Sequence, residues 1–264
     1  MHELASELEV IVGPGSAKYG SNAVHGLINF SLPRPTETSS RVHVAASSLG
    51  RQKIDGLAKF RDELVVGISA QHDNGWRDFT SVDQQKIYLA SEFEIGDWNA
   101  FAWVSGANLN QETADFLEGP RAYRDRDLAK TNSDPEAFRD ARSGRAAIQL
   151  VNDSEAIQWR VTPYARWQEM EFRQHFLPFR GIEENGHEAF GLQTRADWTL
   201  NDAIEWRFGA DLDFSNGYLI ETQDLETFGP FPQGVHYDYD VDTDVFAFWT
   251  EIDAHITDLS LIHI

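Results

Sequence analysis

Apolar and polar side chains alternate along almost the whole chain from Arg41 onward, the pattern of β-strands with two unlike faces. In the segment Ala203–Phe214 every even-numbered residue is apolar, whereas the odd-numbered residues are mostly charged. Ten segments show the pattern: Arg41–Ser48, Lys53–Phe60, Leu64–Gln71, Asp83–Ile95, Trp98–Asn110, Arg145–Val151, Ile157–Gln168, Phe190–Leu200, Ala203–Phe214 and Asp244–Thr257. Since about 9–11 tilted residues suffice to cross a bilayer as a strand, the sequence predicts an all-β fold whose strands can span a membrane.

The connections between these segments also alternate in length. Tight turns are expected at Arg61–Glu63, Gly96–Asp97, Asn152–Glu155 and Asn201–Asp202. Between them, after the third strand, lie long polar segments at His72–Val82, Gln111–Arg142, Arg173–His187 and Gly217–Val241. A soluble sandwich has no reason to sort its connections in this way, whereas outer-membrane barrels have short periplasmic turns and long extracellular loops. The alternation therefore favours a transmembrane antiparallel β-barrel.

Large aromatic residues on the apolar faces also favour a membrane barrel. Trp159, Trp167, Trp198, Trp206, Phe208 and Trp249 would overfill the interior of a small barrel. Facing outward, the same side chains can form the aromatic girdles of a membrane barrel. A soluble all-β carbohydrate- or ligand-binding module and a passive porin-like channel are the alternatives that this pattern leaves open.

Composition excludes several other classes. The chain has 43 acidic and 22 basic residues and a net charge of −21, which counts against a nucleic-acid partner because phosphate binding rests on clustered Lys and Arg. It contains no Cys, so a disulfide scaffold, a Cys-ligated metal and a Cys nucleophile are excluded. The mean hydropathy of −0.44 and the lack of a long apolar run exclude a transmembrane helix, but not alternating membrane strands.

The first forty residues follow a different pattern. Residues 8–35 read LEVIVGPGSAKYGSNAVHGLINFSLPRP. We expect a short strand at Glu9–Val12, a Gly- and Pro-rich turn, and a second strand at Val24–Leu32 that Pro33 and Pro35 bring to an end. A phosphate-binding loop is disfavoured, because the Gly-Lys-Ser/Thr ending and a following long helix are missing.

This stretch resembles the C-terminal end of the plug domain of TonB-dependent outer-membrane receptors, where (I/V)EV(I/L)(R/K)GPxSxxYGxxAxxG(V/L)IN precedes the barrel. The matching residues, at gapless spacing, are Glu9, Val10, Ile11, Gly13, Pro14, Ser16, Tyr19, Gly20, Ala23, Gly26, Ile28 and Asn29. Of these, Gly13, Pro14, Ser16, Tyr19, Gly20, Ala23, Gly26 and Asn29 form the structural plug motif. Val12 departs from the family's Arg or Lys and His25 from its small residue, which puts in doubt the ion pair that the basic residue makes.

The resemblance implies the end of an N-terminal plug domain at residues 1–35 and the first part of a barrel at residues 36–258, with about ten of the family's 22 strands present. It implies TonB-dependent active import of a scarce solute, such as siderophore-iron, cobalamin or an oligosaccharide, across the Gram-negative outer membrane. No enzymatic step and no cofactor are expected. The implied partners are TonB, through an N-terminal box missing from this chain, a small-molecule or metal-chelate ligand, and outer-membrane lipid and lipopolysaccharide.

Candidate ligand-binding residues lie in two of the long polar segments. An aromatic and cationic mixture that suits an anionic ligand is offered by Phe116, Arg121, Tyr123 and Arg124, and further candidates are Phe231, His236 and Tyr237. The carboxylates that alternate from Asp238 to Asp244 suit a hard cation, but they lack the Gly and terminal Glu of a calcium loop, so no metal site is predicted. Charged residues on the polar strand faces, including Arg160, Arg195 and Arg207, are expected to pair across neighbouring strands.

Both chain ends look truncated. No signal peptide precedes the first patterned segment at Leu8, and we expect the chain to be a fragment of a longer protein. The last six residues, Leu259–Ile264, resemble a reading frame of a transposon end used in DNA library preparation. We therefore expect residues 259–264 to be a non-native tail, and the alternative is an ordinary apolar strand end.

Overall fold

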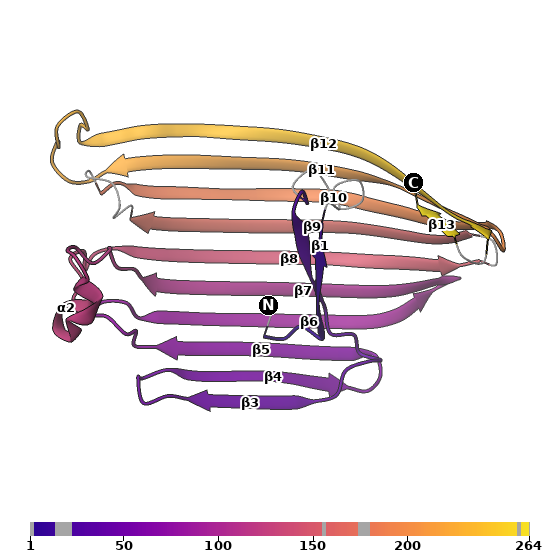
Figure 1. Cartoon of the computed structure of the whole chain (residues 1–264), viewed down its shortest axis with the longest axis horizontal. Helices are drawn as coiled ribbons and strands as arrows, with labels where there is room; N and C mark the ends of the chain where they lie inside the picture. Colours follow the sequence, from indigo (N-terminus) through magenta and orange to yellow (C-terminus); the bar gives the residue numbers. More distant parts are fainter. Residues whose placement is uncertain (1–2, 14–22, 155–156, 174–179, 258–259, 264) are drawn as a thin grey trace.

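A computed structural model describes residues 3–13, 23–154, 157–173, 180–257 and 260–263. The described chain forms two antiparallel sheets, a small one of two strands and a large one of eleven strands in sequential order (Figure 1). The small sheet pairs β1 (Glu7–Val12) with β2 (Gly26–Ser31). The large sheet contains β3 (Arg41–Ala46), β4 (Gln52–Phe60), β5 (Leu64–Asp73), β6 (Val82–Ile95), β7 (Trp98–Glu112), β8 (Phe138–Asp153), β9 (Ile157–Arg173), β10 (Ile182–Asn201), β11 (Ile204–Gln223), β12 (Gly234–Thr257) and β13 (Ser260–His263).

The predicted order of strands and turns is confirmed, and every strand pairs only with its sequence neighbours. The predicted tight turns lie at one end of the large sheet, and the long connections lie at the other, together with the short β3–β4 turn between Ala46 and Gln52 (Figure 1). The β7–β8 connection carries the only helices of the described residues, η1 (Ala122–Arg124) and α2 (Arg126–Lys130). None of the described helices is long and apolar enough to cross a membrane.

The strands extend further toward the long connections than the sequence predicts. β8 begins at Phe138 rather than Arg145, β10 at Ile182 rather than Phe190, and β12 at Gly234 rather than Asp244. In the extensions of β8 and β10 both faces are largely polar, so the hydrophobic alternation disappears although the backbone pairing continues. In β12 the alternation continues with the opposite phase: Asp238, Asp240 and Asp242 lie outward, and Tyr237, Tyr239 and Val241 lie inward. Period-2 patterning therefore traces a strand reliably only while its apolar side chains stay on the same face.

The two faces of the large sheet are those that the alternation predicts. The outward face carries an apolar belt whose side chains are widely exposed, among them Ile68, Ile87, Phe190 and Phe248. Aromatic residues contact one another along the belt, as in the stacked pairs Trp198–Trp206 and Phe190–Phe214. Such a continuous exposed apolar surface on long strands is typical of a lipid-facing wall and not of a protein surface in water.

The described residues 3–13 and 23–36, called the N-terminal unit, lie across the other face of the large sheet, here called the inner face (Figure 1). Leu4 packs into a buried cluster with Leu57, Val65, Tyr88, Ala90 and Phe101 of the wall. The Tyr88 hydroxyl donates a hydrogen bond to the Pro33 carbonyl at 2.9 Å. Arg34 donates to Glu92 at 2.9 Å and to Gln149 at 2.8 Å. These contacts hold the N-terminal unit against β4–β8.

Candidate ligand-binding site

The β7–β8 connection is folded against the β5–β6 connection by polar contacts. The Arg77 guanidinium donates hydrogen bonds to the Thr131 carbonyl at 2.9 and 2.6 Å and to the Asp115 carbonyl. The Asn132 amide donates to the carbonyls of Phe79 and Thr113, both at 3.1 Å. These side chains satisfy backbone groups that a long loop would otherwise leave to water, so the connection has a defined shape.

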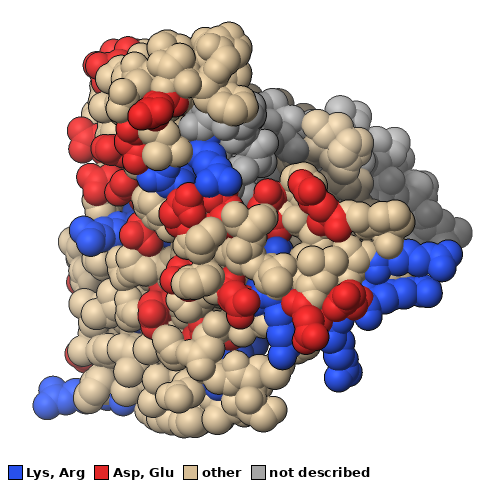
Figure 2. Space-filling view, turned by 90° about the vertical axis from the view of Figure 1, so that its left-hand side faces the viewer, with Lys and Arg blue, Asp and Glu red and all other residues tan. Residues whose placement is uncertain are grey.

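The predicted candidates of this connection all lie on its surface. Phe116 and Tyr123 are each 68% exposed. Arg121 has a left-handed φ of 60° and precedes η1, and the Arg124 guanidinium lies 5.9 Å from the centroid of the Tyr123 ring. Figure 2 looks onto this end of the molecule and shows acidic and basic side chains interspersed over it. The surface of the β7–β8 connection therefore offers a ligand four accessible side chains: Phe116, Arg121, Tyr123 and Arg124.

The second group of candidates lies partly on a strand, which corrects the expectation that all of them are loop residues. Phe231 is in the β11–β12 connection, whereas His236 and Tyr237 belong to β12. The His236 ring lies 3.1 Å from a carboxylate oxygen of Glu221 and 2.8 Å from the Pro232 carbonyl. The reason for the difference is the extension of β12, because backbone pairing of Tyr237 with Glu221 continues above the apolar belt. The two candidate groups lie at the same end of the sheet, separated by the ends of β8, β9 and β10 (Figure 1).

Ion pairs link the connections at this end to one another. Arg173, at the end of β9, binds both carboxylate oxygens of Asp224 at 3.1 and 3.0 Å. The hydrogen bond from Arg173 lowers the pKa of the Asp224 carboxyl. Arg180 lies 3.5 Å from the buried Asp134 and 2.9 Å from Glu136 of the β7–β8 connection. Bidentate arginine–carboxylate pairs fix geometry as well as charge, so this end of the molecule is ordered by more than its strands.

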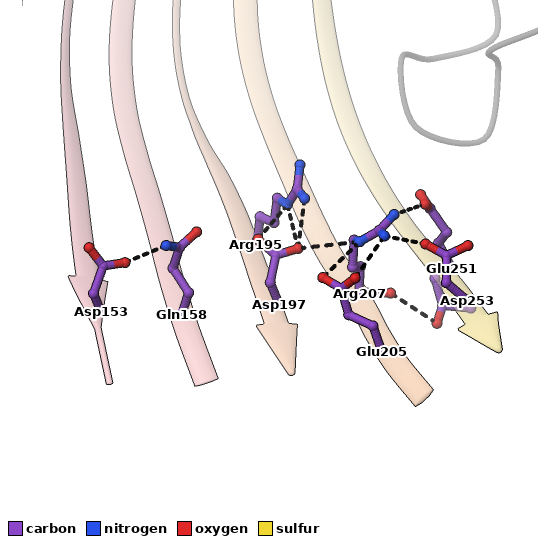
Figure 3. A network of polar contacts seen from close by, with 9 residues as sticks. Asp153, Gln158, Arg195, Asp197, Glu205, Arg207, Glu251 and Asp253 are labelled. Carbon is purple, nitrogen blue, oxygen red and sulfur yellow. Dashed lines mark hydrogen bonds and ion pairs between the residues drawn. The ribbon is translucent and has the colours of Figure 1, made fainter. Parts of the chain in front are cut away.

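Polar side chains on the inner face form part of the cross-strand pairs that the sequence predicts. Figure 3 shows this network near the tight-turn end of β8–β12. Arg207 of β11 pairs across strands with Glu251 and Asp253 of β12, and it also contacts Glu205 of its own strand at 3.0 Å. Arg195 instead pairs with Asp197 of its own strand, β10, at 2.7 Å. Higher on the same face, Arg166 pairs with Asp213 at 3.0 Å.

Arg160 departs from the predicted pairing. It lies directly opposite Arg195 in the β9–β10 register, and its Nε atom is buried without a hydrogen-bond partner in the described part of the chain. Among the residues that the structure describes, no group of three or more His, Asp or Glu side chains is placed to hold a metal ion. The carboxylates from Asp238 to Asp244 alternate along β12, so the interpretation as a strand is confirmed.

Four of the eight residues of the plug motif fall within the described residues. Gly13 ends β1 with a φ of 112°. Gly26 begins β2 with a φ of 144°, and a Cβ there would lie 2.4 Å from the Ile11 carbonyl oxygen, so only glycine fits. Ala23 is buried, and Asn29 pairs with Glu9 across the hairpin. Pro14, Ser16, Tyr19 and Gly20 lie outside the described residues.

The sequence did not reveal the residues that fasten the N-terminal unit to the wall. Glu3 and Lys86 form a buried ion pair of 2.6 Å, and Arg34 reaches Glu92 and Gln149. These partners are far apart in the chain, and no local pattern connects them. The sequence signal for these contacts is limited to Lys86 and Tyr88, which lie at inner-face positions of a strand with ordinary apolar–polar alternation.

The fold defines a class of protein. No protein-family model and no curated protein sequence matches the chain. Solved structures do match: the chain has the fold of part of a TonB-dependent outer-membrane receptor, an antiparallel β-barrel.

Three of these structures show the extent of the likeness. The ferripyoverdine receptor of the outer membrane of Pseudomonas aeruginosa, bound to ferripyoverdine, matches with a TM-score of 0.77 at 12% identity, over 98% of this chain and 41% of that chain. The siderophore receptor PiuA from Acinetobacter baumannii gives 0.64 at 13%, over 98% and 50%. The unliganded ferric citrate transporter FecA gives 0.66 at 12%, over 97% and 48%. The chain thus spans half or less of the length of these receptors.

Proposed function

We propose that the chain is part of a receptor that imports a scarce solute across the Gram-negative outer membrane, with energy supplied through TonB. The observation that carries the proposal is the N-terminal unit, which is fastened by Leu4, Pro33 and Arg34 to the inner face of a sheet whose outer face is an apolar belt. A passive channel needs no such unit in its lumen. A soluble binding module would not expose Phe190 and Phe248 on the same face as Ile68 and Ile87.

The proposal divides the chain as the resemblance does. Residues 1–35 are the end of the plug, residues 36–258 are the first part of the barrel, and residues 259–264 are a non-native tail. The long connections then face the outside of the cell, where Phe116, Arg121, Tyr123, Arg124, Phe231, His236 and Tyr237 meet the solute. The acidic outward residues above the belt lie at the level of lipopolysaccharide. The solute is moved without chemical change, so no cofactor and no catalytic group are required.

The test uses the full-length gene product in a Gram-negative host. We expect it to carry a signal peptide, a TonB box and the rest of the plug upstream of this segment, to fractionate with the outer membrane, and to need detergent for purification. Uptake of its solute is expected to be lost in a strain without TonB. A monomer that stays in solution without detergent, or a gene without the upstream plug, would contradict the proposal.

A further inference from the structure

Two neighbouring rows of residues on the inner face contain no carboxylate between β7 and β12. The register places Ser105, Arg145, Arg166, Ala189, Ser215 and Thr243 side by side in one row. The next row toward the long connections contains Ala107, Ser143, Gln168, His187, Gly217 and Val241. Acidic residues outnumber basic ones by 43 to 22 in this chain, so composition does not explain a wall segment whose charged residues are both arginines.

Those two arginines face each other across neighbouring strands. Arg145 of β8 lies directly opposite Arg166 of β9, and like charges in this position are destabilising. Arg166 has a counterion in Asp213, whose carboxylate also accepts a hydrogen bond from the Tyr164 hydroxyl. Arg145 is exposed and makes no ion pair or hydrogen bond within the described part of the chain. The Nε atom of Arg166 is buried and lacks a hydrogen-bond partner there as well.

The outward face at the same height has the opposite charge. Glu188 of β10 and Asn216 of β11 lie beside Asp242 of β12, and Asp244 is one position lower on the same face. The sheet therefore separates charge across its thickness, with acidic residues outside and arginines inside. The described N-terminal unit contacts the same rows over β4–β6, through Leu4, Glu3 and Pro33, and leaves the arginines of β8 and β9 uncovered by these contacts.

We propose that Ser143, Arg145, Arg166, Gln168 and His187, here called the arginine patch, bind a carboxylate or another oxyanion of the imported solute. The inference rests on the proposed function and names the chemical class of its substrate. A guanidinium offers parallel N–H donors that match an oxyanion, and the serine, glutamine and histidine beside it offer further hydrogen-bond donors. An anion between Arg145 and Arg166 would also remove the repulsion between them.

The oxyanion that binds the arginine patch has two possible sources, the solute and a carboxylate of the receptor itself. The experiment distinguishes between them. Full-length receptor in detergent is titrated with two anionic probes, ferric citrate and a ferric tris-catecholate, and with a cationic one, ferrioxamine B. We expect an anionic probe to bind in preference to the cationic one, and Arg145→Gln to weaken that binding about tenfold or more. Arg145→Lys should retain part of it. Arg142→Gln, which removes an exposed arginine from the outward side of the same strand, is the matched control and should leave binding unchanged.

Different results would overturn the arginine patch and the proposed function. The proposal is overturned by unchanged affinity in Arg145→Gln, by preference for the cationic probe, or by failure of both anionic probes to bind. It is also overturned if Arg145→Gln lowers the melting temperature of the ligand-free receptor by more than about 3 °C, since the partner is then a carboxylate of the protein. Anion binding that depends on Arg145 in a receptor whose uptake does not need TonB would refute the proposed function and leave the arginine patch standing.

Discussion

The ion pair between Glu3 and Lys86 fastens the N-terminal unit to the barrel wall. Its atoms are 2.6 Å apart, and both side chains are more than nine-tenths buried. Burial by itself raises the pKa of the Glu3 carboxyl, but the hydrogen bond and charge of Lys86 outweigh it and lower this pKa to about 2. Removing one partner of a buried pair leaves an uncompensated charge, which costs about 3–5 kcal/mol, whereas removing both costs less. We therefore expect Lys86→Met to lower the stability of the full-length receptor more than Glu3→Gln combined with Lys86→Met, as measured by thermal unfolding in detergent.

The same pair predicts a pH dependence. Because the pKa of Glu3 is lower in the folded protein than its ordinary value of 4.5, the carboxylate contributes its full stability above that value and loses it as the pH falls toward 2. Wild-type receptor and Glu3→Gln should differ in melting temperature at about pH 6, and the difference should shrink as the pH falls below 4.5 and disappear near pH 2. A difference that grows on acidification would contradict the assignment.

Strand β12 shows where the apolar belt ends. Its outward positions change from Asp238, Asp240, Asp242 and Asp244 to Phe246 and Phe248, and Phe248 is 82% exposed. A charged residue on the lipid face costs about 2–4 kcal/mol near the bilayer midplane and about 0–1 near its edges. We expect Phe248→Arg to reduce assembly of the full-length receptor into the outer membrane severalfold, measured as the folded fraction in membrane preparations. Asp242→Arg, at an outward position of the same strand, is the control, and equal loss in both variants would contradict a lipid boundary at this level.

The belt also explains what the sequence predicted and what it did not. Strands were recognised where outward positions are apolar, as from Ile204 to Phe214, and were cut short where the outward positions become charged, as at the start of β12. The cross-strand pairing of Arg207 followed from the alternation, whereas Arg195 pairs with Asp197 of its own strand. The contacts of Glu3 and Arg34 did not, because they depend on how the N-terminal unit lies against the wall, which no local pattern encodes.

At the scale of the whole molecule, the large sheet has two free edges. β3 pairs on one side only, and the short β13 pairs with β12 only from Asp253 to Thr257, so most of β12 is also a free edge and the described sheet is open. A free edge presents a row of unpaired backbone donors and acceptors, and in lipid each unsatisfied group costs several kcal/mol. In water, the exposed belt of Phe190, Phe246 and Phe248 adds an apolar surface that favours association.

These two features together predict the behaviour of the 264-residue chain expressed alone. Water leaves the apolar belt exposed, and lipid leaves the backbone groups of the free sheet edges without hydrogen bonds. We therefore expect the chain to aggregate in detergent and to fail to insert into liposomes, as measured by size-exclusion chromatography and flotation. Under the proposed function, further strands of a full-length receptor close the barrel, and that receptor should insert under the same conditions. Strands can cross a bilayer only when their backbone hydrogen bonds form a closed set. Recovery of a monomer of the short chain that floats with liposomes would therefore show that the backbone groups of the two free edges are paired in another way.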